Sequence, residues 1–287
     1  MPSNPLFPQK NFKEQHELEQ RRIQQEEMQR RIDEYRRLEN ERIRYRDKQI
    51  QLKELEAFLK KQENKKVQKK KNRRDVHVCF VIDESSSMYT ARHETIAGFN
   101  NYINKLKLDQ ENEKVNIIVS VTKFNNKSQV LYTNTNVNEL PALSQYNYNP
   151  SGSTALYDAL GDTVSLLEAH VGAKITAAKK SKKALPKVLV VVMTDGEENC
   201  STRYNMDAIS YKIAELDKKP NWTFVYIGAD QDSWKNSGAI GINALNTVNY
   251  NKAETHRAMD NLYFSTKSYL LSADSKSNNF FDGKKGI

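Results

Sequence analysis

The fold is decided by the stretch Val76-His77-Val78-Cys79-Phe80-Val81-Ile82, which leads directly into Asp83-Glu84-Ser85-Ser86-Ser87. A short apolar run of this kind is typical of a buried strand. The oxygen-bearing side chains of Asp83, Ser85 and Ser87 are therefore expected at the carboxyl end of that strand. Ligands of open α/β sheets bind at this end. Hard oxygen ligands at alternate positions of one turn suit Mg²⁺, Mn²⁺ or Ca²⁺.

Strands and helices are expected to alternate along the rest of the chain. Apolar runs predict strands over 76–82, 115–124, 128–133, 188–194 and 222–228. Helices are predicted between them, over about 91–107, 155–170, 204–218 and 253–271. The short run 128–133 follows Asn125-Asn126-Lys127 and reads as an antiparallel hairpin partner of the strand before it. Strands that are apolar on both faces and separated by helices indicate a mostly parallel sheet covered on both sides. The prediction is a doubly wound α/β domain over residues 75–273 with one short antiparallel edge strand.

Two more oxygen-bearing side chains are expected at the same edge of this sheet. Thr154 precedes the predicted helix 155–170, and Asp195 follows the strand 188–194. If strand 188–194 lies beside strand 76–82, these side chains can converge with the first three. Gly152 and Gly196 allow the tight turns that such convergence requires. The alternative for each single residue is a cap at a helix N-terminus, because Asp, Ser and Thr favour such positions.

The complete set resembles the metal-ion-dependent adhesion site of von Willebrand factor A domains. The positions that match in type, order and approximate spacing are Asp83, Ser85, Ser87, Thr154 and Asp195. The stretch Gly-Ser-Thr-Ala-Leu-Tyr-Asp-Ala over 152–159 is also typical of that family. The resemblance covers about residues 75–273 and implies the Rossmann-like fold of the family. It also implies that Ser85, Ser87 and Thr154 bind the ion directly, whereas Asp83 and Asp195 act largely through waters.

A site of this kind implies a protein-binding function. Two carboxylates offset the charge of the ion only nominally, so the ion keeps electrophilic character. A coordination position that is vacant or filled by water can then accept an Asp or Glu carboxylate from another protein. We predict a metal-dependent adhesion or scaffold module, with Mg²⁺ as the expected ion and Mn²⁺ or Ca²⁺ as alternatives. Glu197 and Glu198, which follow Asp195, are interpreted as exposed acids; the alternative is that they adjust the field of the ion.

Motifs of common enzyme sites are missing from the sequence. It contains neither a Gly-x-Ser-x-Gly elbow nor a phosphate-binding loop that ends in Gly-Lys-Ser/Thr. The five histidines show no metal-ligand spacing. An Asp-x-Asp phosphatase would need a second acid where Ser85 stands. We therefore predict a protein that is not an enzyme, and a metal-assisted hydrolase is the lower-ranked alternative.

The N-terminal quarter differs sharply in charge from the rest. Residues 1–74 contain 22 Lys and Arg against 13 Asp and Glu, whereas residues 75–287 contain 23 of each. The whole formal charge of +9 therefore belongs to the first segment. Residues 1–12 are expected to be disordered. The absence of glycine and proline and the acid–base pairs at spacing four predict a charged helix over 13–64, best supported over 13–62. Its sparse apolar residues leave two interpretations open, a solvated single helix and a weak self-associating coiled coil.

A basic run over 65–74 contains seven basic residues and no acid, and it is predicted to be a linker. The alternatives are a nuclear-import signal and a tether to nucleic acid or to an anionic membrane. A second basic cluster, Lys179–Lys183, is predicted to form a loop. The tail 274–287 is predicted to be flexible, although Phe280 and Phe281 could dock back onto the domain.

Targeting signals are not visible in the sequence. No apolar stretch approaches the ~20 residues that a membrane span needs, and the first residues lack the apolar region of a signal peptide. Cys79 and Cys200 are not expected to form a structural disulfide, because one lies inside a strand and the other in a loop. The prediction is an intracellular protein, either cytoplasmic or, if 65–74 acts as an import signal, nuclear.

Overall fold

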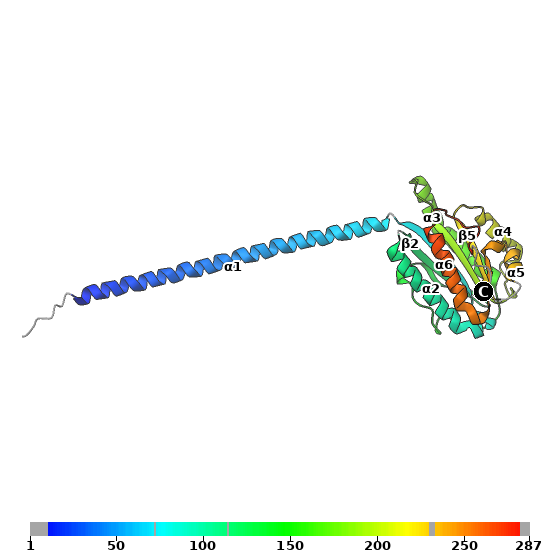
Figure 1. The fold of residues 1–287 in the computed structure, drawn as a ribbon, viewed down its shortest axis with the longest axis horizontal. Helices are drawn as coiled ribbons and strands as arrows, with labels where there is room; N and C mark the ends of the chain where they lie inside the picture. Colours follow the sequence, from blue (N-terminus) through cyan, green and yellow to red (C-terminus); the bar gives the residue numbers. More distant parts are fainter. Residues whose placement is uncertain (1–10, 72, 114, 230–232, 282–287) are drawn as a thin grey trace, which may run out of the picture. The chain divides into compact units, whose positions relative to one another are not determined.

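The computed structural model describes residues 11–71, 73–113, 115–229 and 233–281, and the chain divides into two compact units, residues 1–69 and 70–287 (Figure 1). The segment 1–12, predicted to be disordered, lies outside the described residues except for its last two, which begin the first helix. Among the described residues, no helix combines the length and apolar character needed to cross a membrane.

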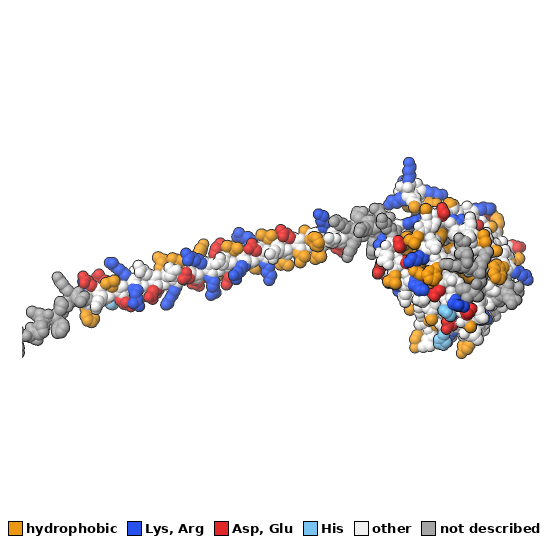
Figure 2. All heavy atoms as spheres, viewed as in Figure 1, with side chains coloured by type: hydrophobic (Ala, Val, Ile, Leu, Met, Phe, Trp, Pro, Cys, Tyr) orange, Lys and Arg blue, Asp and Glu red, His pale blue; other side chains and the backbone are white. Residues whose placement is uncertain are grey.

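The first unit is formed by the helix α1 (Asn11–Lys71), whose 61 residues extend over about 90 Å at the usual helical rise. Every side chain from residue 12 to residue 64 is exposed apart from the half-buried Glu39. Acidic, basic and apolar side chains are mixed along its visible face (Figure 2), and the apolar residues form no continuous stripe. Ion pairs one turn apart, such as Arg22–Glu26 at 3.4 Å and Arg37–Glu41 at 3.7 Å, support the helix by tenths of a kcal/mol each.

The predicted linker 65–74 was wrong over most of its length, because α1 continues through Lys71. Lysine and glutamine are good helix formers, and neither glycine nor proline interrupts residues 65–71. Strand β1 begins at Arg74, so the described part of the connection is Arg73 alone.

The second unit contains a six-stranded sheet in the order β3-β2-β1-β4-β5-β6, as far as the structure describes the chain. All neighbouring strands are parallel except β2 and β3, which are antiparallel. The strands are β1 (Arg74–Asp83), β2 (Val115–Phe124), β3 (Ser128–Asn136), β4 (Lys187–Thr194), β5 (Trp222–Gly228) and β6 (Thr247–Asn249). The predicted fold class is confirmed. Strand β1 also pairs with β4, which is the condition on which convergence of the site residues depends. Strand β6 was not predicted, because three residues are too few to show a pattern.

Helices cover both faces of the sheet. They are α2 (Arg92–Asn112), α3 (Leu156–Lys180), α4 (Met206–Asp217), α5 (Ser233–Ala239) and α6 (Thr255–Leu271). Helices α2 and α6 lie side by side on one face (Figure 1). There the ring of Phe80 in β1 packs edge-on against the rings of Phe99 and Tyr102, with centroids 5.1 Å and 5.2 Å apart. Helices α3 and α4 cover the other face, which receives Cys79 and Val81. The alternation along β1 thus sends successive side chains into two separate cores.

Helix α3 ends ten residues later than predicted, so Lys179 and Lys180 belong to its last turn and not to a loop. Lysines are favourable there, because the helix C-terminus carries partial negative charge.

The C-terminal tail is packed against the domain as far as the structure describes it, and the prediction of a flexible tail was wrong for residues 274–281. Phe280 and Phe281 are 5% and 0% exposed and join the core beneath α6. The Phe280 ring lies 6.0 Å from that of Tyr269, and its backbone N–H donates to Asn246 Oδ1 at 2.9 Å. The domain therefore continues beyond residue 273, because apolar rings dominate a segment whose other residues are polar. Residues 282–287 lie outside the described part.

Candidate metal-binding site

Three loops meet at the carboxyl edge of the sheet, following β1, preceding α3 and following β4. The register pairs Ile82 with Met193, so β1 and β4 end side by side. Backbone hydrogen bonds join the first two loops, from Ser86 N to Gly152 O at 3.0 Å and from Ser151 N to Glu84 O at 2.8 Å. Gly152 adopts φ +79°, and a side chain there would collide with Asn126. Glycine is thus required where these loops cross.

Polar side chains from the first and third loops form one connected chain of hydrogen bonds. Asp83 is fully buried and accepts from Ser85 N at 2.7 Å and from Thr194 Oγ1 at 2.6 Å. Ser87 Oγ donates to Asp195 Oδ1 at 2.7 Å and lies 2.9 Å from Ser85 Oγ. The aspartates are therefore held in fixed orientations toward the two serines.

The position of Gly196 shows how Thr154 joins this set. A Cβ atom placed on Gly196 would lie 3.1 Å from Thr154 Oγ1, 3.6 Å from Ser87 Oγ and 3.8 Å from Asp83 Oδ2. Oxygen atoms from the first two loops thus approach one point beside Gly196 of the third loop. The structure brings together all the residues predicted for the site, and their roles as ligands stay predictions.

The alternative that these residues only cap helices does not account for Ser85 or Thr154. Ser85 is the N-cap residue of the 3₁₀ turn η1 (Ser86–Ala91), but its side chain makes no capping hydrogen bond within the described chain. The N-cap residue of α3 is Ala155 and not Thr154.

The donor set fits a hard divalent cation. One buried oxygen, Asp195 Oδ2, accepts no hydrogen bond from the described residues other than Lys252. The ammonium of Lys252 lies 2.5 Å from it. The described residues contain no group of three or more His, Cys, Asp or Glu side chains placed for a metal, so a site here would depend on two carboxylates and three hydroxyls. Mg²⁺ and related ions accept such oxygen ligands.

Several residues that support the site were not predicted. Asn199 makes two hydrogen bonds with the backbone of Thr154. Its side-chain Oδ1 accepts from Thr154 N at 2.9 Å, and its backbone N–H donates to Thr154 O at 3.1 Å. The Tyr148 hydroxyl donates to Asp83 O at 2.7 Å. Glu84 is buried and pairs with Lys123 at 3.0 Å. Their roles depend on contacts between distant segments, which no local pattern reveals.

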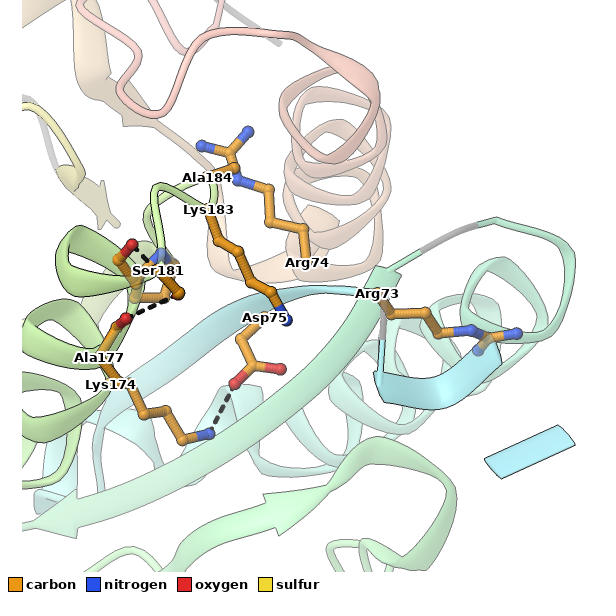
Figure 3. A pocket seen from close by; sticks show the side chains of 10 residues that line it. Arg73, Arg74, Asp75, Lys174, Ala177, Ser181, Lys183 and Ala184 are labelled. Atoms are coloured by element: carbon orange, nitrogen blue, oxygen red, sulfur yellow. Dashed lines mark hydrogen bonds and ion pairs between the residues drawn. The ribbon is translucent and has the colours of Figure 1, made fainter. Parts of the chain in front are cut away.

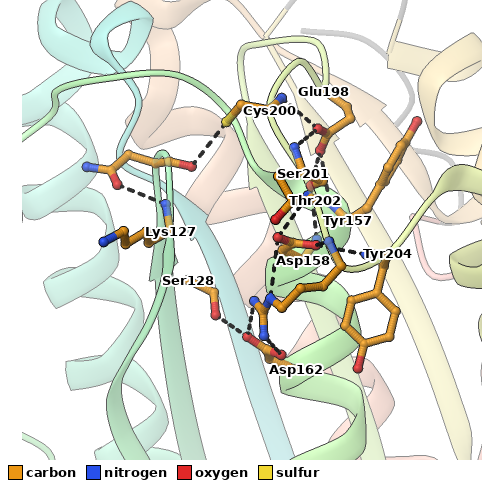
Figure 4. Close-up of polar contacts among 12 residues, drawn as sticks. Lys127, Ser128, Tyr157, Asp158, Asp162, Glu198, Cys200, Ser201, Thr202 and Tyr204 are labelled. Atoms are coloured by element: carbon orange, nitrogen blue, oxygen red, sulfur yellow. Dashed lines mark hydrogen bonds and ion pairs between the residues drawn. The ribbon is translucent and has the colours of Figure 1, made fainter.

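The interpretation of Glu198 as an exposed acid was wrong, whereas Glu197 is exposed as predicted. Glu198 is half-buried and accepts hydrogen bonds from the backbone N–H groups of Tyr157, Cys200 and Ser201 (Figure 4). The first turn of a helix leaves N–H groups without partners, and Glu198 satisfies one of them in α3. The loop after β4 is thereby fixed to the start of α3.

Burial of Asp83 raises the pKa of its carboxyl group to about 6, and the charge of Asp195 contributes in the same direction. The folded protein therefore favours the protonated form of Asp83, whose ordinary pKa is 3.8. The resulting stabilisation is fully present below about pH 4 and is lost as the pH rises through about 6.

We expect this loss in the metal-free protein to amount to roughly 3 kcal/mol. The measurement is the free energy of unfolding of the wild type and of Asp83→Asn between pH 4 and pH 7. The difference between the two proteins isolates this carboxyl group from all others. A difference that stays constant with pH would contradict the prediction.

A profile of the von Willebrand factor type A domain matches residues 77–264, which is more than half of the chain. The chain belongs to this family. The family is one of metal-dependent adhesion domains, and the match includes every predicted site residue. A search of curated proteins found no match.

Several solved structures are similar to this chain at low sequence identity. A von Willebrand factor type A protein from Catenulispora acidiphila is 13% identical with a TM-score of 0.43, covering 68% of this chain and 43% of its own. Proximal thread matrix protein 1 from the mussel byssus is 14% identical with a TM-score of 0.44, covering 69% and 47% respectively. The manganese-loaded TRAP protein of Plasmodium vivax is 17% identical with a TM-score of 0.40, covering 64% and 71%. The chain thus spans less than half the length of the first two proteins.

The opposite edge of the sheet carries a groove of about 590 Å³ at the start of β1 (Figure 3). Most of its cationic side chains already have partners within the domain. Arg73 donates to Gln110 O at 2.7 Å, Arg74 donates to Leu185 O at 2.9 Å, and Lys174 pairs with Asp75 at 2.8 Å. The alternative of a tether for nucleic acid or membrane at residues 65–74 stays a hypothesis, because the side chains of 65–72 lie outside the described part of the chain.

Proposed function

We propose that this protein is a metal-dependent protein-binding module that captures an acidic side chain of a partner at the carboxyl edge of its sheet. The hydroxyls of Ser85, Ser87 and Thr154 would hold a divalent cation directly, and Asp83 and Asp195 would hold it largely through waters. Mg²⁺ is the expected ion, with Mn²⁺ and Ca²⁺ as alternatives. When bound, the ion supplies an electrophilic centre for a carboxylate oxygen of the partner.

The observation that carries this proposal is the convergence of three oxygen atoms from two loops, those of Thr154, Ser87 and Asp83, around Gly196 of the third loop. Three hydroxyls among the ligands leave much of the charge of a divalent ion uncompensated. The exposed Ser87 places the site at the surface, where another protein can reach it. Asn199 and Glu198 orient the loops in advance, so little ordering is needed when a partner binds.

The remaining expectations belong to the same proposal. We also propose that the protein is not an enzyme, because its sequence contains neither the nucleophile elbow nor the phosphate-binding loop of common enzyme sites. For α1 we favour a solvated single helix, because its apolar residues form no continuous seam. An intracellular location stays part of the proposal, whereas self-association through α1 and an anionic partner for residues 65–74 stay alternatives for experiment.

The test uses peptides that each present a single Asp or Glu, with matched peptides in which Asn or Gln replaces the acid. We expect the full chain to bind a subset of the acidic peptides in Mg²⁺. Its affinity for these peptides should fall by at least about 10-fold in chelator. The amide peptides should not bind, because a neutral oxygen makes a weaker contact with a cation. Equal binding of acid and amide peptides, or binding that chelator does not change, would contradict the proposal.

A further inference from the structure

Lys252 brings a positive charge of the chain itself into the candidate site. It is the first residue of the 3₁₀ turn η4 (Lys252–Glu254), which directly precedes α6. Its ammonium lies 2.5 Å from Asp195 Oδ2 and donates to Ser87 O at 3.3 Å. The Asp195 side chain is fully buried, whereas the Lys252 side chain is 33% exposed.

The two oxygens of Asp195 are used differently. Oδ1 accepts the hydroxyl of Ser87, so it is already engaged within the site. Oδ2 is paired with the ammonium of Lys252 at 2.5 Å and accepts no other hydrogen bond from the described residues. An ammonium at 2.5 Å and a divalent cation near the same carboxylate repel each other strongly, since both are positive and the carboxylate is withdrawn from water.

We propose that Lys252 is a tethered counter-cation that competes with the divalent ion for Asp195 and so sets the metal affinity of the site. This inference rests on the proposed function. In the metal-free protein, Lys252 offsets the charge of a buried carboxylate. When the ion binds, the lysine side chain swings out to solvent, which its flexible stem and its partial exposure allow.

The backbone around Lys252 is fixed, so the exchange depends on the side chain. Asn251 Oδ1 accepts from Ala253 N at 3.0 Å, and Thr255 Oγ1 donates to Lys252 O at 2.8 Å. Turn η4 also contacts η1, which carries Ser87. Lys252 therefore links the metal edge to the start of α6 without requiring that the turn itself unfold.

The experiment measures the Mg²⁺ dissociation constant by calorimetry, and the melting temperature of the metal-free protein, for the full chain and three variants. Lys252→Met removes the charge and keeps most of the side-chain length, and Lys252→Arg keeps the charge. Lys180→Met is the matched control, since Lys180 is exposed at the far end of α3. We expect Lys252→Met to bind Mg²⁺ about 10-fold more tightly and to melt at a lower temperature when metal-free. Lys252→Arg and Lys180→Met should keep the wild-type affinity.

Unchanged or weaker Mg²⁺ binding by Lys252→Met, with a wild type that binds, would overturn the inference and leave the proposed function standing. Tighter binding by Lys252→Arg would also overturn it, because the charge would then not be the cause. If neither the wild type nor any variant binds Mg²⁺, the proposed function fails together with the inference.

Discussion

Replacement of Thr154 by valine is expected to weaken Mg²⁺ binding by at least about 100-fold. Valine has nearly the same shape as threonine but lacks the hydroxyl that approaches the point shared with Ser87 and Asp83. Thr154 is 3% exposed, and Asn199 binds both its N–H and its C=O. The backbone should therefore stay in place when the hydroxyl is removed. Calorimetric titration of each purified protein with Mg²⁺ measures the effect.

Thr154→Ser is the matched control, since it restores a hydroxyl at the same atom position. It should bind Mg²⁺ within about threefold of the wild type, a difference of well under 1 kcal/mol. Melting temperatures in chelator establish that both variants are folded. Wild-type affinity in the valine variant would show that Thr154 is not a ligand.

Phe281→Ala is expected to lower the free energy of unfolding of the domain by about 3–5 kcal/mol. Phe281 is fully buried and meets the ring of Phe280 edge-on at 5.2 Å. Phe280 in turn packs against Tyr269 of α6. Removal of the ring leaves a cavity within a core that also holds α6, so the expected fall in melting temperature is about 10 °C.

The matched control is Phe264→Ala, because Phe264 lies on α6 but is 50% exposed. Its cost should stay below about 1 kcal/mol. Urea denaturation followed by the fluorescence of the two tryptophans reports on the domain and not on α1, since Trp222 and Trp234 both lie in the second unit. Equal small effects of both substitutions would restore the prediction of a flexible tail.

Local patterns in the sequence predicted most of the fold. The continuous apolar run of residues 76–82 predicted a strand covered on both faces, and the side chains of this run in β1 are buried. The absence of helix breakers predicted α1, although its end was placed too early because charge was interpreted as a linker. The loops after β1 and β4 were expected at one edge because parallel strands end together.

Features that depend on contacts between distant segments were beyond the sequence. Phe280 and Phe281 stand among serine, asparagine and lysine, and only the core that they share with α6 explains their burial. Glu198 reads as one acid among several, and its function as a cap depends on where α3 begins. Lys252 has no motif, and its contact with Asp195 arises because η4 meets the loop after β1.

The most direct measurement is the thermal unfolding of the metal-free full chain as Mg²⁺ is added. We predict that the domain is stabilised with the saturation curve of one site, reaching about 2.7 kcal/mol when Mg²⁺ is at 100 times its dissociation constant. Chelator should reverse the stabilisation, and Asp195→Ala should abolish it. An unfolding transition that is the same in Mg²⁺ and in chelator would contradict the central claim that the oxygens around Gly196 form a metal site.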